Sequence, residues 1–229
     1  VKTNTVPPFV MVLQTRGDHA DFLLEHMRGG NHAFHADNHE PVGAVLERAL
    51  EECASDGADS SASPSLMIDG GAYFGFFGFQ AVAAGCDAVL VEPQRALAPF
   101  LAASALLNGA EFAKRVQLVR GLISGPVPTM WPAHFQLVDR YGMSSYAVPA
   151  EASVATIETF TVDGLLRDAD QSKTKQPLHN FEDNGMSPLP NIVALKLDIE
   201  GLEVAALQGV KQLALTRGHI QNILIEFGP

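Results

Sequence analysis

The chain has little cysteine and no long apolar run. Only Cys53 and Cys86 are present among 229 residues, which excludes a framework of several disulfides and a four-cysteine zinc site. We therefore expect two free thiols, which leave the cellular compartment open. No run of about 18 consecutive apolar residues occurs, and no signal peptide is evident, so we predict no membrane segment within this chain.

Positive charge is also scarce. The chain has 26 Asp and Glu residues against 15 Lys and Arg residues, and its formal net charge is −11. A protein that binds nucleic acid needs a basic face that replaces the counterions of the phosphates. We therefore predict no nucleic-acid partner. Hydrophobic residues make up 47% of the chain, which is enough for the core of one α/β domain of this length.

One stretch, Ser65 to Gly78, organises the rest of the chain. Its sequence, SLMIDGGAYFGFFG, has an apolar run typical of a strand buried on both faces, then an acid, a glycine-rich turn and the start of an apolar helix. Glycine lets the backbone turn sharply and lets a ligand approach where no Cβ intervenes. We predict that this turn binds a ligand. The candidate ligand-binding residues of the turn are Asp69, Gly70, Gly71, Ala72, Tyr73 and Gly75.

A second apolar run, at 87–92, ends in an acid. This acid, Glu92, lies 23 positions after Asp69. In nucleotide-binding α/β sites, an acid roughly 20 residues after the glycine-rich turn accepts hydrogen bonds from ribose hydroxyls. We therefore predict that Glu92 binds a ribose. A carboxylate at this place also disfavours a 2′-phosphate, and thus NADP.

Apolar runs and helical segments alternate along the remaining chain. We expect strands at 66–68, 87–92, 115–120, 192–197 and 220–227. Helices are expected between them, for example at 93–107 and 201–215. This alternation predicts an α/β fold with a doubly wound, mostly parallel sheet, helices on both faces, and ligands at the carboxyl ends of the strands.

We expect two parts in the chain. Residues 1–64 are predicted to form a helical and loop extension, with a helix at 41–53, and residues 65–229 to form the ligand-binding domain. The sequence begins with Val1 rather than Met, so we expect it to be part of a longer protein. A targeting or anchor segment could then lie outside it, and the cytoplasm is only the default compartment. Nothing in the sequence predicts an oligomeric state.

The fourth predicted strand carries a more specific motif. Residues 195–203, LKLDIEGLE, followed by LQG at 207–209, are similar to the KIDVEGxE…LxG signature of the FkbM family of S-adenosylmethionine (SAM) methyltransferases. DGGAYFG at 69–75 resembles motif I of Rossmann-type SAM methyltransferases, and VEP at 91–93 resembles motif II. Further resemblances are TVD at 161–163 and IE at 225–226.

The resemblance covers roughly residues 66–229 and departs from the family at two points. The family usually has Asn where this chain has Tyr73, inside the cofactor turn. The strands that complete the family's sheet after the fifth are missing from this sequence, which again favours a partial chain.

The resemblance implies a Rossmann-like methyltransferase sheet, SAM as the cofactor, and methyl transfer to a hydroxyl of a small molecule or glycan. Residues 69–75 would bind the methionine part of SAM, and Glu92 would bind its ribose. Gly121 and Leu122, after the third strand, would lie near the adenine.

Methyl transfer to oxygen needs an aligned acceptor and often a base that removes its proton. Asp198 follows the fourth strand, so we predict that it is the base or orients the acceptor, with Glu200 as the second candidate. Alternation would place Lys196, Asp198 and Glu200 on one face. The acids could instead cap the next helix or hold a divalent cation, although nothing in the sequence requires a metal.

Two other functions stay open. A NAD-linked or nucleotide-sugar oxidoreductase is less favoured, because the turn is not GxGxxG. A catalytically silent, methyltransferase-like binding module is also compatible with Tyr73 and the missing strands. The spacing of His32, His35 and His39 permits a metal site, but their loop-like surroundings favour surface or lid histidines.

Overall fold

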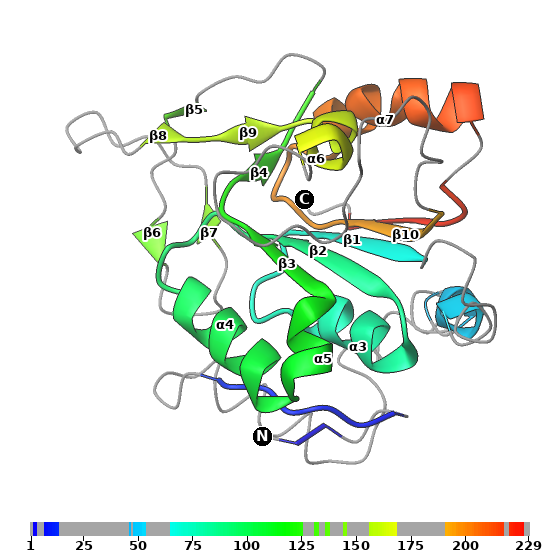
Figure 1. Ribbon diagram of the computed structural model, residues 1–229. Helices are drawn as coiled ribbons and strands as arrows, with labels where there is room; N and C mark the ends of the chain where they lie inside the picture. Colours follow the sequence, from blue (N-terminus) through cyan, green and yellow to red (C-terminus); the bar gives the residue numbers. More distant parts are fainter. Residues whose placement is uncertain are drawn as a thin grey trace.

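The protein folds as an α/β structure built on a parallel sheet. The computed structural model describes residues 2–3, 7–13, 46, 48–53, 65–125, 131–132, 136–137, 144–145, 156–168, 191–217 and 220–226. Within these ranges, helices flank a five-stranded sheet on both faces in a Rossmann-like arrangement (Figure 1). The predicted fold class is confirmed.

The main sheet has the strand order β11-β10-β1-β2-β3, and every neighbouring pair is parallel. Its strands are β1 (Leu66–Gly70), β2 (Asp87–Val91), β3 (Val116–Val119), β10 (Ile192–Leu197) and β11 (Ile223–Ile225). The strands β1, β2 and β10 are buried along their whole length, which explains their continuous apolar runs. The chain crosses from one side of β1 to the other between β3 and β10, so β1 and β10 form the topological switch point.

Two groups of helices cover the two faces of this sheet (Figure 1). One face carries α3 (Phe76–Ala84), α4 (Ala98–Leu107) and α5 (Ala110–Lys114), and the other carries α6 (Val162–Asp168) and α7 (Glu203–Arg217). Each group packs its own apolar cluster against the strands. The expected helix at 93–107 begins later, at Ala98, because the residues after Glu92 first form a turn.

Short strands between β3 and β10 form small sheets apart from the main one. β4 (Leu122–Ile123) pairs with β9 (Thr159–Phe160) in parallel. Two further pairs are antiparallel: β5 (Trp131–Pro132) with β8 (Thr156–Ile157), and β6 (Gln136–Leu137) with β7 (Ser144–Ser145). Figure 1 shows these strands on the side of the sheet where the carboxyl ends of the main strands lie.

The described N-terminal residues belong to the same core as the sheet. Phe9, Met11 and Leu13 are buried in the cluster beneath α3 and α4. The side chain of Asn108 fixes this segment, because it accepts a hydrogen bond from the Val10 N–H at 2.7 Å and donates one to the Val10 carbonyl at 2.8 Å. The division into an extension and a domain stays a prediction, but the two parts share their packing.

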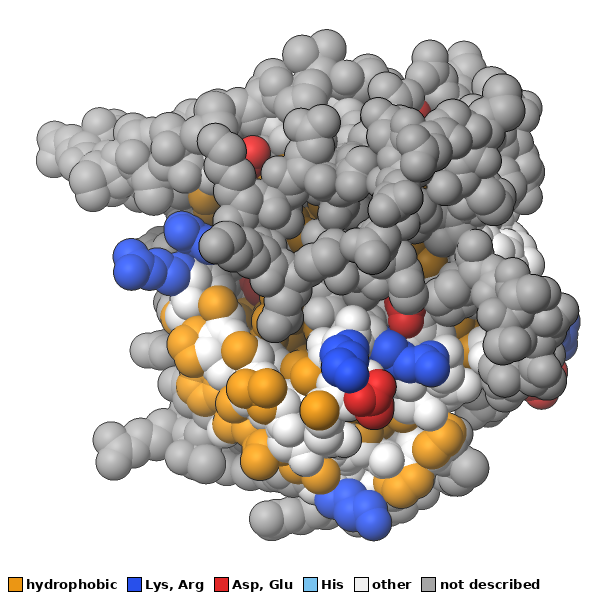
Figure 2. Space-filling model, viewed as in Figure 1, with side chains coloured by type: hydrophobic (Ala, Val, Ile, Leu, Met, Phe, Trp, Pro, Cys, Tyr) orange, Lys and Arg blue, Asp and Glu red, His pale blue; other side chains and the backbone are white. Residues whose placement is uncertain are grey.

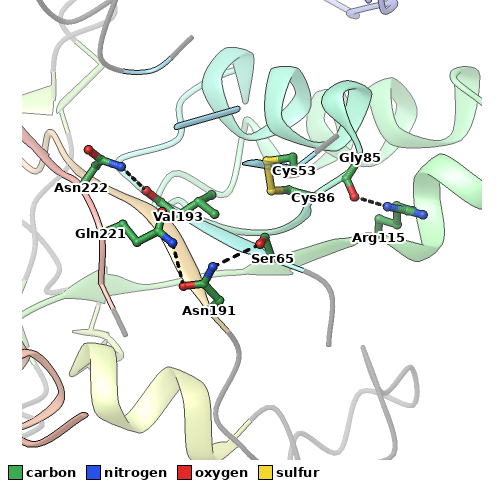
Figure 3. Close-up of a disulfide and its surroundings, with 9 residues drawn as sticks. All are labelled: Cys53, Ser65, Gly85, Cys86, Arg115, Asn191, Val193, Gln221 and Asn222. Atoms are coloured by element: carbon green, nitrogen blue, oxygen red, sulfur yellow. Dashed lines mark hydrogen bonds between the residues drawn. A yellow bond between two sulfur atoms is a disulfide. The ribbon is translucent and has the colours of Figure 1, made fainter. Parts of the chain in front are cut away.

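A disulfide joins the N-terminal part to the sheet, so the prediction of two free thiols is wrong. Cys53 ends the helical residues at 48–53, and Cys86 lies in the connection from α3 to β2; their sulfur atoms are bonded (Figure 3). The pairing depends on helix packing that brings two cysteines 33 positions apart together, and their number alone gave no sign of it. Disulfides persist mainly in oxidising compartments, so this bond argues against the cytoplasmic default.

Polar contacts surround this disulfide at the amino-terminal edge of the sheet. The Arg115 guanidinium donates to the Gly85 carbonyl, next to Cys86. On the other side, the Asn222 side chain donates to the Val193 carbonyl at 2.8 Å (Figure 3). These contacts hold the edge of the sheet that lies away from the carboxyl ends of the strands.

The described surface carries hydrophobic side chains over one group of helices. Figure 2 shows them gathered where Figure 1 places α4. Leu106 and Leu107, at the end of α4, are 70% and 62% exposed. None of the helices in the described ranges is long and apolar enough to cross a bilayer.

Candidate functional site at the carboxyl edge of the sheet

The glycine-rich turn leaves β1 in left-handed backbone conformations. Gly71 has φ +73° and Gly75 has φ +83°, which only glycine adopts without strain. An ideal Cβ on Gly71 would stand 1.7 Å from the carbonyl oxygen of Asp198. The turn after β1 and the loop after β10 are therefore in direct backbone contact, and the absence of a side chain at Gly71 makes this possible.

Tyr73 also adopts a left-handed conformation, with φ +52°. Asparagine is several-fold enriched in this region, whereas a bulky residue there is strained. This gives a physical reason for the Asn that the FkbM family usually has at this place. The Tyr73 ring packs edge-on against Phe74, with 4.4 Å between the ring centroids. Burial, with a smaller effect of Glu92, raises the pKa of the Tyr73 hydroxyl to about 12.

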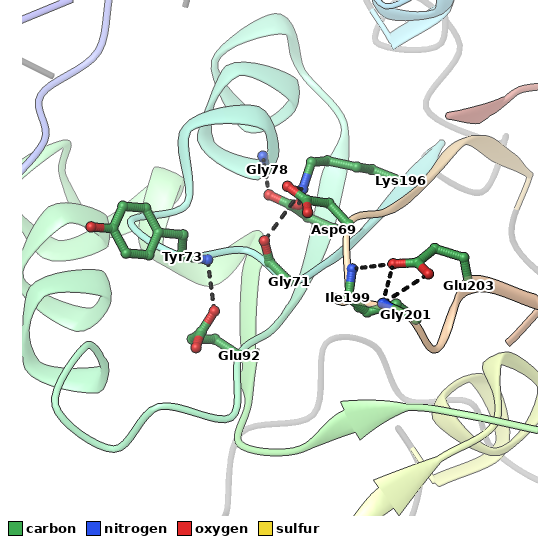
Figure 4. A network of polar contacts seen from close by, with 10 residues as sticks. Asp69, Gly71, Tyr73, Gly78, Glu92, Lys196, Ile199, Gly201 and Glu203 are labelled. Atoms are coloured by element: carbon green, nitrogen blue, oxygen red, sulfur yellow. Dashed lines mark hydrogen bonds and ion pairs between the residues drawn. The ribbon is translucent and has the colours of Figure 1, made fainter. Parts of the chain in front are cut away.

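Hydrogen bonds fix the turn against the end of β2. The N–H groups of Gly71 and Ala72 both donate to the Val91 carbonyl, at 3.0 and 3.1 Å. The Tyr73 N–H donates to Oε2 of Glu92 at 2.8 Å (Figure 4). Because these three N–H groups already have acceptors in the protein, the turn offers a ligand chiefly its carbonyl oxygens and the acids around it.

Glu92 is buried at the end of β2, with 6% of its surface exposed. Its Oε1 accepts a hydrogen bond from the Gln94 N–H at 2.9 Å. Burial raises the pKa of this carboxyl to about 7, against the opposing effect of the N–H groups of Gln94 and Tyr73. A carboxylate has about four acceptor positions, so Glu92 keeps the capacity to accept hydrogen bonds from two ribose hydroxyls.

Asp69 is fully buried at the end of β1, with 0% of its surface exposed. Its Oδ2 accepts a hydrogen bond from the Gly78 N–H at 2.9 Å, which fixes the first turn of α3. Its Oδ1 is buried and has no hydrogen-bond partner, and the Lys196 ammonium lies 3.6 Å from it. Burial raises the pKa of Asp69, although Lys196 and the Gly78 N–H oppose this. Asp69 thus braces the turn from inside the core, where Lys196 is its counter-charge.

Lys196 connects the groups of β1 and β10. The register places it opposite Asp69, and its ammonium lies 3.2 Å from Oδ2 of Asp198. The ammonium also donates to the Gly71 carbonyl at 3.3 Å (Figure 4) and lies over the Phe77 ring. Burial lowers the pKa of Lys196, but the two carboxylates together raise it above its usual value. Lys196 is therefore a positive charge shared between the glycine-rich turn after β1 and Asp198, the predicted base.

The structure separates the two predicted catalytic acids. Asp198 continues β10 by one residue: its N–H donates to the Gly70 carbonyl at 3.1 Å, and its carboxylate is part-buried. Glu200 does not continue the strand, because the backbone turns there with φ +54°, and it is exposed. Burial, Asp198 and Glu203 raise the pKa of Glu200. Lys196 and Asp198 therefore share a side as expected, whereas Glu200 lies in the following turn.

Glu203 holds the turn that leads into α7. One of its oxygens accepts from the N–H groups of Ile199 and Gly201, at 3.0 and 3.1 Å, and the other accepts from Gly201 at 3.0 Å (Figure 4). Both N–H groups belong to the turn before α7, and the carboxylate of the first residue of the helix satisfies them. The second acid of the EGLE sequence thus has a structural role.

Glu226 is a site residue to which the sequence assigned no role. It follows β11, and its N–H donates to the Leu197 carbonyl at 3.0 Å, which aligns it with Asp198 on the adjacent strand. Burial, the charge of Asp198 and a hydrogen bond between these two carboxyl groups raise the pKa of Glu226 to about 7. In the sequence, the resemblance of residues 225–226 (IE) was the only indication that Glu226 belongs to the site. The strand order explains it, because β11 lies beside β10.

Gly121 and Leu122 lie at the start of β4. A Cβ on Gly121 would stand 2.4 Å from the Phe160 ring, so close packing against β9 requires the glycine. The Leu122 side chain is buried with Ile157, and its N–H donates to the Glu158 carbonyl at 3.0 Å. The predicted contact of these residues with adenine stays a prediction.

No family model, curated protein or solved structure matches this chain.

The described residues also bear on the metal question. Among them, no group of three or more His, Cys, Asp or Glu side chains is arranged to hold a metal ion. His32, His35 and His39 lie outside the described residues. The described acids instead form contacts with backbone N–H groups, with Lys196 and with each other. This arrangement suits an organic ligand that carries hydroxyl and ammonium donors.

Proposed function

We propose that this protein is a SAM-dependent methyltransferase of the FkbM type, which methylates a hydroxyl group of a small molecule or a glycan. The observation that carries the proposal is the hydrogen bond between Glu92 and the Tyr73 N–H. This hydrogen bond connects the buried carboxylate of Glu92, which can still accept further hydrogen bonds, with the glycine-rich turn after β1. The turn lies beside the switch point of the parallel sheet. Open α/β sheets bind their ligands at this point.

The residues present fit the functional groups of SAM. Glu92 would accept the ribose hydroxyls. The Gly71 carbonyl keeps a second acceptor position besides the one that Lys196 uses, and this position is suited to the ammonium of the methionine part. The compact turn leaves no room for a Cβ at Gly71. Bound SAM supplies a methyl group on a positively charged sulfur.

Asp198 is the residue that we assign to the acceptor. It lies beside the turn, it is part-buried, and the ammonium of Lys196 fixes its carboxylate at 3.2 Å. A carboxylate held in this way can accept a hydrogen bond from a hydroxyl and orient its oxygen, which is the positioning that methyl transfer requires.

Isothermal titration calorimetry with SAM, S-adenosylhomocysteine and NAD tests the cofactor. We expect the two sulfur-containing ligands to bind and NAD not to bind. Replacing Glu92 by Gln should weaken both by roughly 10- to 100-fold, since hydrogen bonds to a charged group contribute about 1.5–3 kcal/mol. The exposed Glu111 is the matched control, and Glu111→Gln should bind as the wild type does. Binding of NAD alone would favour the oxidoreductase instead.

A screen of hydroxyl-containing extracts with methyl-labelled SAM tests turnover. We expect label to be transferred to an oxygen of a small molecule or glycan. Asp198→Asn should bind S-adenosylhomocysteine nearly as well as the wild type but transfer label more slowly, by roughly 100-fold or more. If the wild type binds SAM and labels no acceptor, the silent binding module becomes the better description.

A further inference from the structure

The helix α4 has its polar and apolar sides reversed. None of its ten residues, APFLAASALL, is charged, and its one polar side chain, Ser104, is buried. The Ser104 hydroxyl donates to the Phe100 carbonyl at 2.8 Å and accepts from the Val12 N–H at 2.8 Å. Leu106 and Leu107 are instead on the outer side, 70% and 62% exposed. A helix at the surface of a globular protein normally places its polar residues outward, so the outer side of α4 has the composition of a buried surface.

The apolar surface continues from α4 to the edge of the sheet. β3 is the outermost strand on this side and packs against both α4 and α5. Leu118 on β3 is 38% exposed. Three of the five large hydrophobic side chains that are exposed in the described part of the chain therefore belong to this surface. Single exposed apolar residues are normal, whereas a group of large ones marks a site of interaction. We call the surface of α4, α5 and β3 the α4 face.

The α4 face is basic, although the chain is acidic. Residues 93–123 contain one acid, Glu111, and four basic residues, so their net charge is +3, whereas that of the whole chain is −11. The basic residues are Arg95, Lys114, Arg115 and Arg120, and all four are exposed. Positive charge is thus concentrated where the apolar side chains are exposed.

The basic residues stand on both sides of the apolar ones. Arg95 comes before α4, while Lys114 ends α5 and Arg115 follows it. Figure 2 shows basic side chains on two sides of the apolar group over α4. Glu111 pairs with Lys114 at 2.7 Å, so Arg95, Arg115 and Arg120 have no acid partner among the described residues. An apolar centre with a basic border is typical of protein surfaces that lie in the headgroup region of a bilayer.

We propose that the α4 face docks on a membrane surface that contains anionic lipids, with Leu106 and Leu107 inserted between the headgroups. The leucines would enter the apolar boundary of the bilayer, and the basic side chains would contact the lipid phosphates and carboxylates. Arg95 and Arg120 follow the carboxyl ends of β2 and β3, so docking would bring the edge with the candidate site next to the membrane. This inference does not depend on the proposed methyl transfer.

Charge favours a lipid surface over a second copy of the chain. In a two-fold dimer the same surface of both copies meets, so the basic residues of one α4 face would lie against those of the other. Each copy has only Glu111 on this face to offset them. Like charges repel across such an interface, whereas anionic headgroups attract the basic residues.

Co-sedimentation of the full chain with vesicles tests the docking. One set of vesicles is phosphatidylcholine alone, and the other contains about 30% phosphatidylserine, which gives the surface a negative potential. We expect binding to the anionic vesicles to be tighter by roughly 10-fold or more. It should fall by roughly 10-fold when the salt concentration rises from about 0.05 M to about 0.5 M, because salt screens the charges. Equal binding to both sets, or binding to neither, would overturn the proposal.

Two pairs of substitutions measure the apolar and the charged contributions. Leu106→Gln combined with Leu107→Gln should weaken binding to the anionic vesicles by roughly 10-fold or more, because the leucines no longer enter the apolar boundary. Arg95→Gln combined with Arg120→Gln should weaken it by roughly 10-fold or more, because two charges near the headgroups are lost. Unchanged binding in either pair would show that these residues do not form the contact.

The chain offers a matched control for each pair. Val204 is 62% exposed, but it lies on α7, over the other face of the sheet. Arg48 is exposed among the N-terminal helical residues, away from α4. Val204→Gln and Arg48→Gln should bind the anionic vesicles as the wild type does. An equal loss in these controls would mean that the α4 face has no special part in binding.

Tryptophan fluorescence locates the contact. Leu107→Trp should show a blue shift when anionic vesicles are added, because the indole leaves water for the interface. Val204→Trp should show no shift, and Trp131 is present in both variants as a common background. A shift in Val204→Trp alone would place the contact on the other side of the molecule and overturn the proposal.

Analytical ultracentrifugation without vesicles tests the second copy. A dimer that dissociates when Leu106 and Leu107 are replaced by Gln would assign the α4 face to a second copy and overturn the docking on lipid. The substituted side chains are exposed, so the variants should fold, which circular dichroism checks. If the leucine pair does not fold, the arginine pair and Leu107→Trp decide.

Discussion

The carbonyl oxygen of Asp198 occupies the space where a side chain on Gly71 would begin. An ideal Cβ on Gly71 would lie 1.7 Å from this oxygen, far closer than any real contact. The contact joins the turn that we assign to the cofactor to the residue that we assign to the acceptor. Both parts of the proposed site thus rest on one backbone contact at the switch point.

Gly71→Ala should strongly destabilise the fold. The new methyl group would collide with the Asp198 carbonyl, and Gly71 has φ +73°. Gly109→Ala is the matched control, since Gly109 has φ +102° but no atom lies within 4 Å of its Cβ position. We expect about 1–3 kcal/mol for the control and a clearly larger loss for Gly71→Ala, measured by urea denaturation. If both variants lost the same free energy of unfolding, the loss would come from backbone strain and not from the collision with the Asp198 carbonyl.

Lys196→Met should destabilise the protein by about 3–5 kcal/mol, because it leaves two carboxylates at the edge of the core without their ammonium. Adding Asp69→Asn to this variant should restore part of the loss, since the amide still accepts from the Gly78 N–H. Urea denaturation of the two single variants and the double variant gives the coupling. Lys114→Met removes an exposed ion pair and should leave stability unchanged within error. If the losses of unfolding free energy in Lys196→Met and Asp69→Asn simply added up in the double variant, this would contradict an ion pair between Lys196 and Asp69.

Glu92 should make stability depend on pH. Burial raises its pKa to about 7 in the folded protein, from an ordinary 4.5, so the folded state binds more protons between these values. The contribution is fully present below about pH 4.5, is lost as pH rises to about 7, and totals about 3 kcal/mol. Denaturant titrations from pH 4.5 to 8 should show this decline.

Glu92→Gln is the control for this dependence, because Glu226 titrates in the same range. The variant should be less stable, since one backbone N–H loses its acceptor, and its stability should decline less with pH. An unchanged pH dependence in Glu92→Gln would assign the titration to other groups.

Reduction of the Cys53–Cys86 bond should lower stability by about 3–4 kcal/mol, because it frees a loop of 33 residues in the unfolded chain. Thermal unfolding with and without dithiothreitol measures the change. The double variant Cys53→Ala and Cys86→Ala should unfold at a lower temperature that dithiothreitol does not alter. Iodoacetamide should label neither cysteine before reduction, and labelling of both in the oxidised, denatured protein would disprove the bond.

The sequence predicted the centre of the sheet well, for a physical reason. β1, β2 and β10 are buried on both faces, so their apolar runs are continuous and their ends are marked by acids. Glu92 could be found because the length of one strand–helix–strand unit sets its spacing from Asp69. The polar position of Asp198 after β10 followed in the same way.

Features that depend on packing between distant elements could not be predicted. The pairing of Cys53 with Cys86 needs the N-terminal helical residues to lie against α3, and no local signal records this. Glu226 belongs to the site only because β11 lies beside β10. The placement of Glu200 depends on where β10 ends, and two left-handed residues in succession, Glu200 and Gly201, override the alternation of a strand.

The packing around Cys53 has a consequence for how the protein can be shortened. A fragment that began at Ser65 would keep every strand of the main sheet, yet it would uncover the apolar surface that Leu46 and Leu50 now cover, including Met67 and Ala81. It would also leave Cys86 without its partner. Such a fragment would be prone to cross-link two copies through this thiol, so preparations of the protein should retain the chain from before residue 46.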